Sequence, residues 1–323
     1  MTSQAAQAVI GIDLGGTKIA AAVLTPDGVL HEREHVPTEA EEGREHVIAR
    51  LIAVVRSLQE RTSYTVHAIG IGAPAPLSPS QGIIWEAPNM PGWDRVPLRD
   101  LMQGELSLPV ALENDARAAG LAEARVGAGR SASSMLYVTV GTGIGGALLI
   151  DGRLIRGASE TAGEIGHMVM NPSGPLCGCG NYGCLEQYSA GPAIERRAAE
   201  LIREGAPSIL SEIAADRLTG ESVAEAARAG DAVGLRAYQD AGTWLGAGIA
   251  SVVNLFNPAT VVVGGGVAQT GDLLMSPVRS SVRHHSLNRA FEALSIHTAM
   301  LGTDAGILGA GMAAIDLPAA GVS

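Results

Sequence analysis

Three cysteines and one histidine lie close together near the middle of the chain. All the cysteines of the 323-residue sequence, Cys177, Cys179 and Cys184, fall within eight residues, and His167 precedes the first of them by ten positions. Three thiolates and one imidazole form a complete tetrahedral ligand set for zinc, and an odd number of cysteines cannot pair fully in disulfides. Free thiols are the alternative. The spacing predicts a structural zinc site, and a reducing cytoplasm suits thiols that are all assigned to metal.

Two glutamates flank this cluster, which a purely structural zinc site does not require. Glu164 lies three residues before His167, and Glu186 lies two residues after Cys184. Carboxylates accept hydrogen bonds from pairs of hydroxyl groups, so the two residues favour a ligand site beside the metal, with salt bridges as the alternative. The sharp turns between the cysteines are expected to use the backbone freedom of three glycines. These are Gly178, Gly180 and Gly183.

An internal repeat supplies the second chemical signal. Residues 9–30 and residues 135–155 each contain an apolar strand, a glycine turn, a second apolar strand and an Asp-Gly turn. Two such turns can direct backbone N–H groups at a polyphosphate, whereas a single one is usually a plain hairpin. Neither copy is a Walker loop, because GxxxxGK[ST] is absent. The letters of residues 141–146 match GxGxxG, but a strand follows them rather than the helix that a dinucleotide site requires.

The elements that position these residues read as a mixed sheet covered by helices. We expect strands at 8–13, 18–24, 66–72 and near 110–112, and a further hairpin strand after Asp27-Gly28. We also expect one helix from about 40 to 60 and another that begins at 115. In the first helix, apolar residues recur at helical spacing on one face. They are Val47, Leu51, Val54, Val55 and Leu58.

Composition limits the classes of partner. The net charge is −11 and no lysine or arginine cluster is present, which argues against nucleic acid. Residues 244–268 carry no charge, but Asn257-Pro258 interrupts them. We expect a buried helix ending near Phe256 and a strand at 260–263 rather than a membrane span. No targeting segment is visible at the start, so a cytoplasmic protein is expected.

Five ordered motifs together resemble the ROK family (repressors, open reading frames, kinases), and within it the bacterial glucokinases. They are DLGGTK at 13–18, END at 113–115, GTG at 141–143, EIGH at 164–167 and CGCGNYGCLE at 177–186. The resemblance covers residues from about 8 to about 315. It implies an α/β protein with the actin-like ATPase fold (hexokinase/ribonuclease H-like), in which two α/β domains surround a deep cleft. The expected domains are residues 1–115 with a C-terminal helix at about 303–323, and residues 116–302 with the zinc motif.

The resemblance implies ATP and Mg²⁺ as cofactors. The nucleotide-binding positions carried over are Asp13, Gly15, Gly16, Thr17, Lys18, Gly141, Thr142 and Gly143, with Gly264 and Gly265 on the adenine side. Asp13 would hold Mg²⁺ through water, and the glycine N–H groups would bind phosphate oxygens. The alternatives are a strand-end turn residue at Asp13 and a surface role for Lys18, the only lysine in the chain.

The resemblance also assigns a catalytic base and a sugar site. Asp115 would take the proton of the sugar hydroxyl that attacks phosphorus, with a plain helix N-cap as the alternative. Sugar recognition falls to Asn114, Asp115, Glu164, His167 and Glu186, with Asn89 as a further candidate. One ring nitrogen of His167 would bind zinc while the other contacts the sugar.

The activity implied is ATP-dependent phosphorylation of a hexose at O6, with glucose as the expected substrate. Alternatives within the family are N-acetylhexosamine kinase, fructokinase and a non-catalytic sugar-sensing regulator. Regulators of the family carry an N-terminal helix-turn-helix domain, and only about eight residues precede the first expected strand here. A homodimer or homotetramer is the oligomeric state that the resemblance implies.

Overall fold

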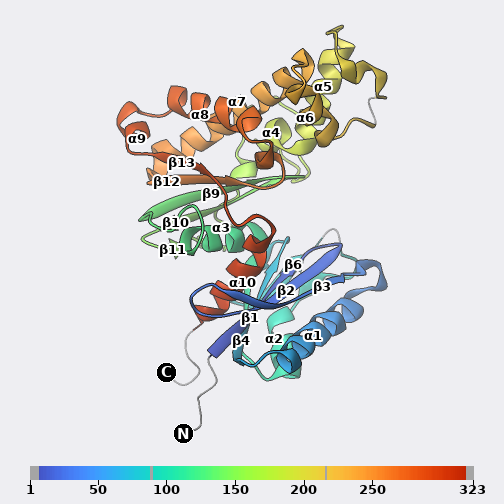
Figure 1. The fold of residues 1–323 in the computed structure, drawn as a ribbon, viewed down its shortest axis with the longest axis vertical. Helices are drawn as coiled ribbons and strands as arrows, with labels where there is room; N and C mark the ends of the chain where they lie inside the picture. The colour runs from blue at the N-terminus through green and yellow to red at the C-terminus, as the bar shows by residue number, and fades with distance from the viewer. Residues whose placement is uncertain (1–6, 88–89, 215–216, 318–323) are drawn as a thin grey trace. The chain divides into compact units, whose positions relative to one another are not determined.

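A computed structural model of the chain describes residues 7–87, 90–214 and 217–317. The chain forms two compact units, each of which contains a mixed sheet covered by helices (Figure 1). The first unit comprises Met1–Arg130, Leu154–Ala162 and Leu301–Ser323, and the second comprises Ser131–Arg153 and Gly163–Met300.

The first unit is built on a five-stranded mixed sheet. Its strands are β1 (Gln7–Leu14), β2 (Lys18–Leu24), β3 (Leu30–Pro37), β4 (Thr65–Ala73) and β8 (Val110–Asn114). They lie in the order β3-β2-β1-β4-β8, with β1, β4 and β8 parallel and β2 antiparallel to both neighbours. The predicted series of strand, strand, helix and strand is confirmed.

Helices and a small second sheet complete this unit. The helices are α1 (Arg44–Arg61), α2 (Leu98–Leu106), α3 (Asp115–Arg125) and α10 (Ala305–Ile315), with 3-10 turns η1 (Ala40–Glu42) and η6 (Gly302–Asp304). The small sheet contains β5 (Leu77–Ser78), β6 (Ile83–Glu86) and β7 (Asp94–Val96), which the sequence pattern did not predict. The division expected after residue 115 falls at the junction of β8 and α3, inside the first unit.

Helix α1 covers one face of the large sheet. Its predicted apolar stripe is buried and packs with Ile10 and Ile12 of β1. The helix begins later than the residue predicted, however. A 3-10 turn occupies residues 40–42, and Gly43 has φ 92°, a left-handed conformation that separates this turn from the α-helix starting at Arg44.

Helix α10 covers the opposite face at very short range. A Cβ atom built on Gly11 of β1 would lie 2.1 Å from the Ile307 carbonyl oxygen, and one on Gly70 of β4 would lie 1.7 Å from the Ala310 carbonyl oxygen. Only glycine permits this approach, because any side chain would overlap the helix backbone. The sheet and α10 therefore pack backbone against backbone.

The second unit repeats the arrangement of the first sheet. Its strands are β9 (Ser134–Val140), β10 (Ile144–Ile150), β11 (Arg153–Leu154), β12 (Thr260–Gly264) and β13 (Ser295–Thr298), in the order β11-β10-β9-β12-β13. Strand β9 pairs antiparallel with β10 and parallel with β12, just as β1 pairs with β2 and β4. The duplicated hairpin that the sequence predicted is therefore present in both sheets.

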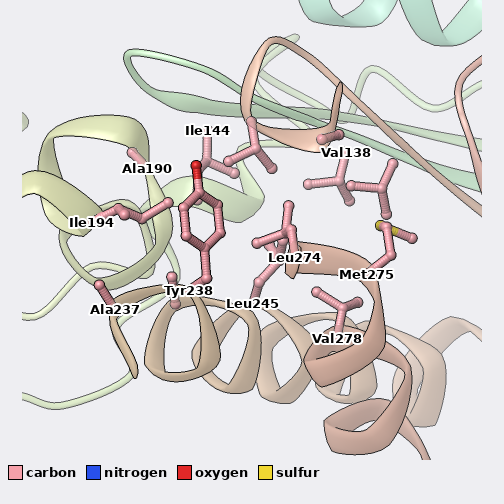
Figure 2. Close-up of a cluster of buried hydrophobic side chains, with 14 of the residues drawn as sticks. Val138, Ile144, Ala190, Ile194, Ala237, Tyr238, Leu245, Leu274, Met275 and Val278 are labelled. Atoms are coloured by element: carbon pink, nitrogen blue, oxygen red, sulfur yellow. The ribbon is translucent and has the colours of Figure 1, made fainter. Parts of the chain in front are cut away.

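The helices of the second unit follow the hairpin in the chain. They are α4 (Glu186–Ser189), α5 (Gly191–Arg203), α6 (Gly220–Arg228), α7 (Ala232–Phe256), α8 (Asp272–His285) and α9 (Asn288–Glu292), with 3-10 turns η2 (Ile165–His167), η3 (Ile209–Glu212) and η5 (Val267–Thr270). Figure 2 shows Tyr238 and Leu245 of α7 and Leu274 of α8 gathered with Val138 and Ile144 of the sheet.

The uncharged stretch of residues 244–268 is folded as the sequence predicted. Helix α7 ends at Phe256, Asn257 adopts a left-handed φ of 47°, and β12 begins at Thr260. Among the described residues, no helix has both the length and the apolar character that a membrane crossing requires.

The contact between Gly70 and α10 predicts a large loss of stability in Gly70→Ala. The added methyl group would overlap the Ala310 carbonyl and force the helix off the sheet, which we expect to lower the free energy of unfolding by roughly 2–4 kcal/mol. Gly104→Ala is the matched control, because Gly104 lies in α2 with nothing within 4 Å of its Cβ position. That change should raise stability by up to about 1 kcal/mol. Urea unfolding measures both, and equal effects would contradict the proposed overlap.

Candidate active site

The first glycine turn joins β1 to β2 and carries Gly15, Gly16, Thr17 and Lys18. The Gly15 amide donates to the Lys18 carbonyl at 2.9 Å, which closes the turn. Buried Thr38 braces it: the Thr38 hydroxyl donates to the Gly15 carbonyl at 2.7 Å, and the Thr38 amide donates to the Thr17 carbonyl at 3.0 Å. Thr17 and Lys18 are exposed. Sequence reasoning missed Thr38, because no local pattern links it to a turn about twenty residues earlier.

Asp13 lies one residue before the end of β1, and its carboxyl group faces the start of α10. A Cβ atom on Gly306 would lie 2.7 Å from Asp13 Oδ2, so the helix backbone contacts the carboxyl group directly. Burial raises the pKa of Asp13, and the positive charge of Lys18 opposes this shift. The arrangement gives a largely enclosed oxygen donor at the end of a strand.

Asp115 is the first residue of α3, directly after β8. The N-cap of the helix is Asn114, whose Oδ1 accepts a hydrogen bond from the Arg117 amide at 3.1 Å. Asp115 Oδ1 accepts from the Ala116 amide at 2.8 Å and from the Asn114 side-chain amide at 2.9 Å. The capping role that was the alternative for Asp115 therefore belongs to Asn114.

The strand register brings these two carboxylates to one edge of the sheet. Asp13 pairs with Gly72 of β4, and Gly72 pairs with Glu113 on the other side, two residues before Asp115. Two strand spacings amount to about 10 Å. The carboxyl ends of parallel strands are where ligands bind in open α/β sheets.

The second glycine turn, between β9 and β10, borders a pocket of about 570 Å³ within the second unit. The Gly141 amide donates to the Gly143 carbonyl at 2.9 Å, and the Gly191 amide at the start of α5 donates to the Gly141 carbonyl at 2.8 Å. Gly141 and Thr142 line the pocket together with residues that sequence reasoning missed. These include Gly191, Pro192, Glu195, Arg228, Tyr238, Gly266, Gln269 and Thr270. They come from four separate segments, and no single sequence pattern joins them.

Gly264 and Gly265 lie against the neighbouring strand β9. A Cβ atom on Gly264 would lie 2.7 Å from the Tyr137 hydroxyl oxygen, and one on Gly265 would lie 2.3 Å from the Val140 carbonyl oxygen. Gly265 also has φ 85°, which favours glycine. These residues shape the backbone that leads to Gly266 at the pocket wall.

The four predicted metal ligands lie together in the second unit. Cys179 Sγ is 3.7 Å from Cys184 Sγ, and Cys177 Sγ is 3.7 Å from His167 Nδ1. One ligand atom from each residue lies within 4.8 Å of the others. The surrounding loop turns at Gly180 (φ 88°) and at Gly183 (φ 70°), which directly precedes Cys184. The third glycine expected to use such freedom, Gly178, has no positive φ.

This donor set fits a tetrahedral metal site. With Zn–S bonds of about 2.3 Å, sulfur atoms around tetrahedral zinc lie about 3.8 Å apart, close to the spacing found here. Without a cation, burial raises the pKa of the Cys184 thiol to about 12 and also raises the pKa of Cys177, while a backbone hydrogen bond from Asn181 lowers the pKa of Cys179. Three neighbouring thiolates need a bound cation at neutral pH.

Glu186 links this cluster to the second glycine turn. Its Oε2 accepts a hydrogen bond from the Ile144 amide at 3.0 Å, and its Oε1 lies 3.7 Å from Cys177 Sγ. A Cβ atom on Gly143 would lie 2.6 Å from Glu186 Oε2, so this glycine leaves space for the carboxylate. The sequence predicted these motifs separately, and the fold brings them into contact.

The remaining sugar-site candidates are placed differently. Glu164 precedes the 3-10 turn η2, and its carbonyl accepts a hydrogen bond from the His167 amide at 3.1 Å. Asn89 lies outside the described residues. The described candidates thus form two groups, one in each unit.

Comparison with known proteins gives the family. The family model described as ROK family matches residues 9–316. The chain belongs to the ROK family.

Known ROK proteins similar to this one include both enzymes and regulators. The glucokinase of Streptomyces coelicolor is 36% identical over 307 residues, which cover 93% of this chain and 95% of that protein. A ROK glucokinase from Streptomyces griseus, solved with glucose and AMPPNP, has a TM-score of 0.80 and 36% identity and covers 96% of this chain and 100% of its own. The xylose repressor of Caldicellulosiruptor bescii is 31% identical and covers 93% of this chain and 76% of that protein. The sugar-kinase/actin-like ATPase fold that the motifs implied is therefore confirmed.

The burial of Asp13 predicts that Asp13→Asn stabilises the ligand-free ROK protein at neutral pH. Because the folded-state pKa is raised, folding becomes less favourable as pH rises above the ordinary aspartate value, and the neutral amide removes that cost. Urea unfolding should give a higher midpoint for the variant at about pH 7, with the gap narrowing toward about pH 4.

Asp304→Asn is the control of opposite sign. The hydrogen bond from Arg33 lowers the pKa of Asp304, so removal of this charge should lower stability at neutral pH, with a loss that shrinks in acid. A destabilised Asp13→Asn protein at neutral pH would mean that other contacts of this carboxylate outweigh its burial.

Proposed function

We propose that this protein is an ATP-dependent hexose kinase that transfers the γ-phosphoryl group to O6 of glucose. The observation that carries the proposal is Asp115, a carboxylate at the same sheet edge as Asp13, in a chain similar to glucokinases over 93% of its length. A phosphoryl transferase needs a phosphate cradle and a base beside the attacking hydroxyl. The two units supply candidates for both.

The nucleotide would bind through both glycine turns. Backbone N–H groups of Gly16 and Thr17 and the exposed Lys18 are suited to phosphate oxygens, as is the turn at 141–143, while the Gly15 amide closes the first turn. The neighbouring pocket of about 570 Å³ has room for a nucleoside, and Gly264-Gly265 shapes its approach. AMPPNP in the similar Streptomyces griseus glucokinase supports ATP as the donor.

Asp13 is the residue that we propose to hold Mg²⁺. Its carboxylate is an oxygen donor beside the first phosphate turn, which suits a hard cation bound largely through water and phosphate. When bound, the ion would neutralise charge on the transferring phosphoryl group. The contact with Gly306 fixes the direction in which the carboxylate points.

Asp115 would act as the base for the sugar hydroxyl. Hydrogen bonds from Asn114 and Ala116 hold one carboxylate oxygen at the start of α3. As O6 attacks the γ-phosphorus of ATP, the bond between that phosphorus and the bridging oxygen would break with ADP as the leaving group, and the O6 proton would pass to the Asp115 carboxylate. Asn114 would hold Asp115 in orientation and contact the sugar.

Glu164, His167 and Glu186 would recognise the remaining hydroxyl groups of the hexose, with Asn89 as a further contact. His167 Nδ1 faces Cys177, so Nε2 is the ring atom left for the sugar when Nδ1 binds metal. We propose that zinc in the cluster of His167, Cys177, Cys179 and Cys184 has this structural role.

A sugar-sensing regulator is the second candidate, favoured by the 31% identity to a xylose repressor. N-acetylhexosamine kinase and fructokinase are alternatives within the same reaction class.

We also propose a cytoplasmic location, which three cysteines without disulfides support. A homodimer or homotetramer is the oligomeric state that we propose.

The decisive experiment assays ATP-dependent phosphorylation of glucose, mannose, fructose, allose, N-acetylglucosamine and N-acetylmannosamine. We expect glucose to be preferred and Asp115→Asn to lower kcat by about 10²–10⁴-fold. The amide retains an oxygen for the Ala116 hydrogen bond, so glucose affinity should change by less than about threefold. A near-normal rate would exclude Asp115 as the base. Sugar binding without turnover in the unmodified protein would favour the regulator.

Metal analysis tests the zinc proposal. The purified protein should contain close to one zinc per chain, and Cys184→Ser should lose it together with glucose affinity and thermal stability. Ser173→Ala is the control, since it alters an exposed hydroxyl in the same loop and no cluster ligand. Normal glucose affinity in a zinc-free protein would separate the metal from the sugar site.

A further inference from the structure

The crossover segment, residues 154–162, belongs to the first unit although the residues on both sides of it belong to the second. It folds back on itself, because the Ala162 amide donates to the Arg156 carbonyl at 2.9 Å. Glu164 follows two residues later. The segment is therefore a closed loop of the first unit that leads directly into a proposed sugar-binding turn.

Glu160 attaches this loop to the first unit through its side chain. One carboxylate oxygen accepts from the Ser80 amide at 3.1 Å, and the other accepts from the hydroxyl groups of Ser80, at 3.1 Å, and Ser78. Ser78 is buried in β5. Three donors on a single carboxylate make a strong, charge-assisted attachment.

The backbone of Glu160 is held as well. Arg117, in the first turn of α3, donates to the Glu160 carbonyl at 2.6 Å. Glu160 has φ 61°, a left-handed conformation that costs energy for a residue with a side chain. The hydrogen bonds of its side chain and carbonyl group maintain this conformation and thereby fix the direction of the chain at Glu160.

Arg117 also connects the loop to β8, the strand that leads directly to the proposed base. Its Nε donates to the fully buried carboxylate of Glu113 at 2.7 Å, and Arg156 of the crossover segment donates to the same carboxylate at 2.8 Å. Glu113 lies two residues before Asp115 at the end of β8. A buried charge of this kind must keep its partners, so the network resists displacement of any member.

We propose that Glu160 is a positioning residue for the hexose site: it clamps the crossover segment onto Ser78, Ser80 and Arg117 and thereby fixes the start of the Glu164–His167 turn. Chain connectivity keeps Glu164 within about 14 Å of Glu160. The inference rests on the proposed function, because its consequence is sugar affinity. The clamp acts through chain geometry, without contact between Glu160 and the sugar.

Glu160→Gln tests the clamp with little change in size. The uncharged amide loses charge-assisted acceptance, so we expect the Kd and KM for glucose to rise about tenfold, with the KM for ATP and the melting temperature nearly unchanged. Ser159→Ala is the matched control, because this exposed residue bonds to Thr161 within the same segment. Unchanged glucose affinity in Glu160→Gln would overturn the proposal.

A second variant tests whether the hydrogen bonds of Glu160 act as a single attachment. Ser80→Ala removes an exposed hydroxyl partner and should weaken glucose binding in the same direction, while adding little in combination with Glu160→Gln because both changes break one attachment. Fully additive losses would contradict a single clamp.

Hydrogen exchange distinguishes failure of the clamp from failure of the proposed function. If the unmodified protein binds none of the sugars, the kinase proposal fails, yet Glu160→Gln should still accelerate amide exchange across residues 161–167 relative to Ser159→Ala. Equal exchange in the two variants would refute the clamp itself.

Discussion

The direct packing of the α10 backbone on β1 and β4 is the contact on which the first unit depends. It requires glycine at Gly11 and Gly70, because the carbonyl groups of α10 occupy the space of their missing side chains. The same approach brings Gly306 against the carboxyl group of Asp13. Packing thereby determines how a proposed cofactor ligand is oriented and why its charge is disfavoured. Asp13 is therefore both a proposed site residue and part of the packing between β1 and α10.

In the second unit, glycine allows a similarly close approach between two helices. Gly242 and Gly246 of α7 lie against α8, with Cβ positions 2.9 Å from the Leu274 carbonyl oxygen and 2.6 Å from the Val278 carbonyl oxygen. With aromatic residues at only 3% of the sequence, close backbone approach and small aliphatic side chains fill the core in place of large rings. In both units, a glycine turn follows a largely buried strand, β1 in the first and β9 in the second.

Charged groups inside this frame act in connected sets. Glu113 is fully buried between Arg117 and Arg156, and Glu186 lies between the Ile144 amide and Cys177. Each carboxylate joins segments that are distant in the chain. Because a buried charge without partners is costly, Glu113 must keep Arg117 and Arg156 in place. In each unit, a carboxylate therefore connects a proposed site residue to a neighbouring segment of the fold.

The sequence by itself determined the local features: both glycine hairpins, the stripe on α1, the end of α7 and the proximity of the four metal-ligand candidates. Period, turn residues and short spacing specify these directly. It misjudged the start of α1, where Gly43 turns the chain, and it contained no signal for Thr38 or for the pocket walls around Gly191 and Arg228. The structure shows that Asn114 caps α3 through a local contact with Arg117 while Asp115 follows. Only the tertiary structure decided that Glu186 joins the cysteine cluster to the second turn. That contact lies between segments far apart in sequence, which no local periodicity encodes.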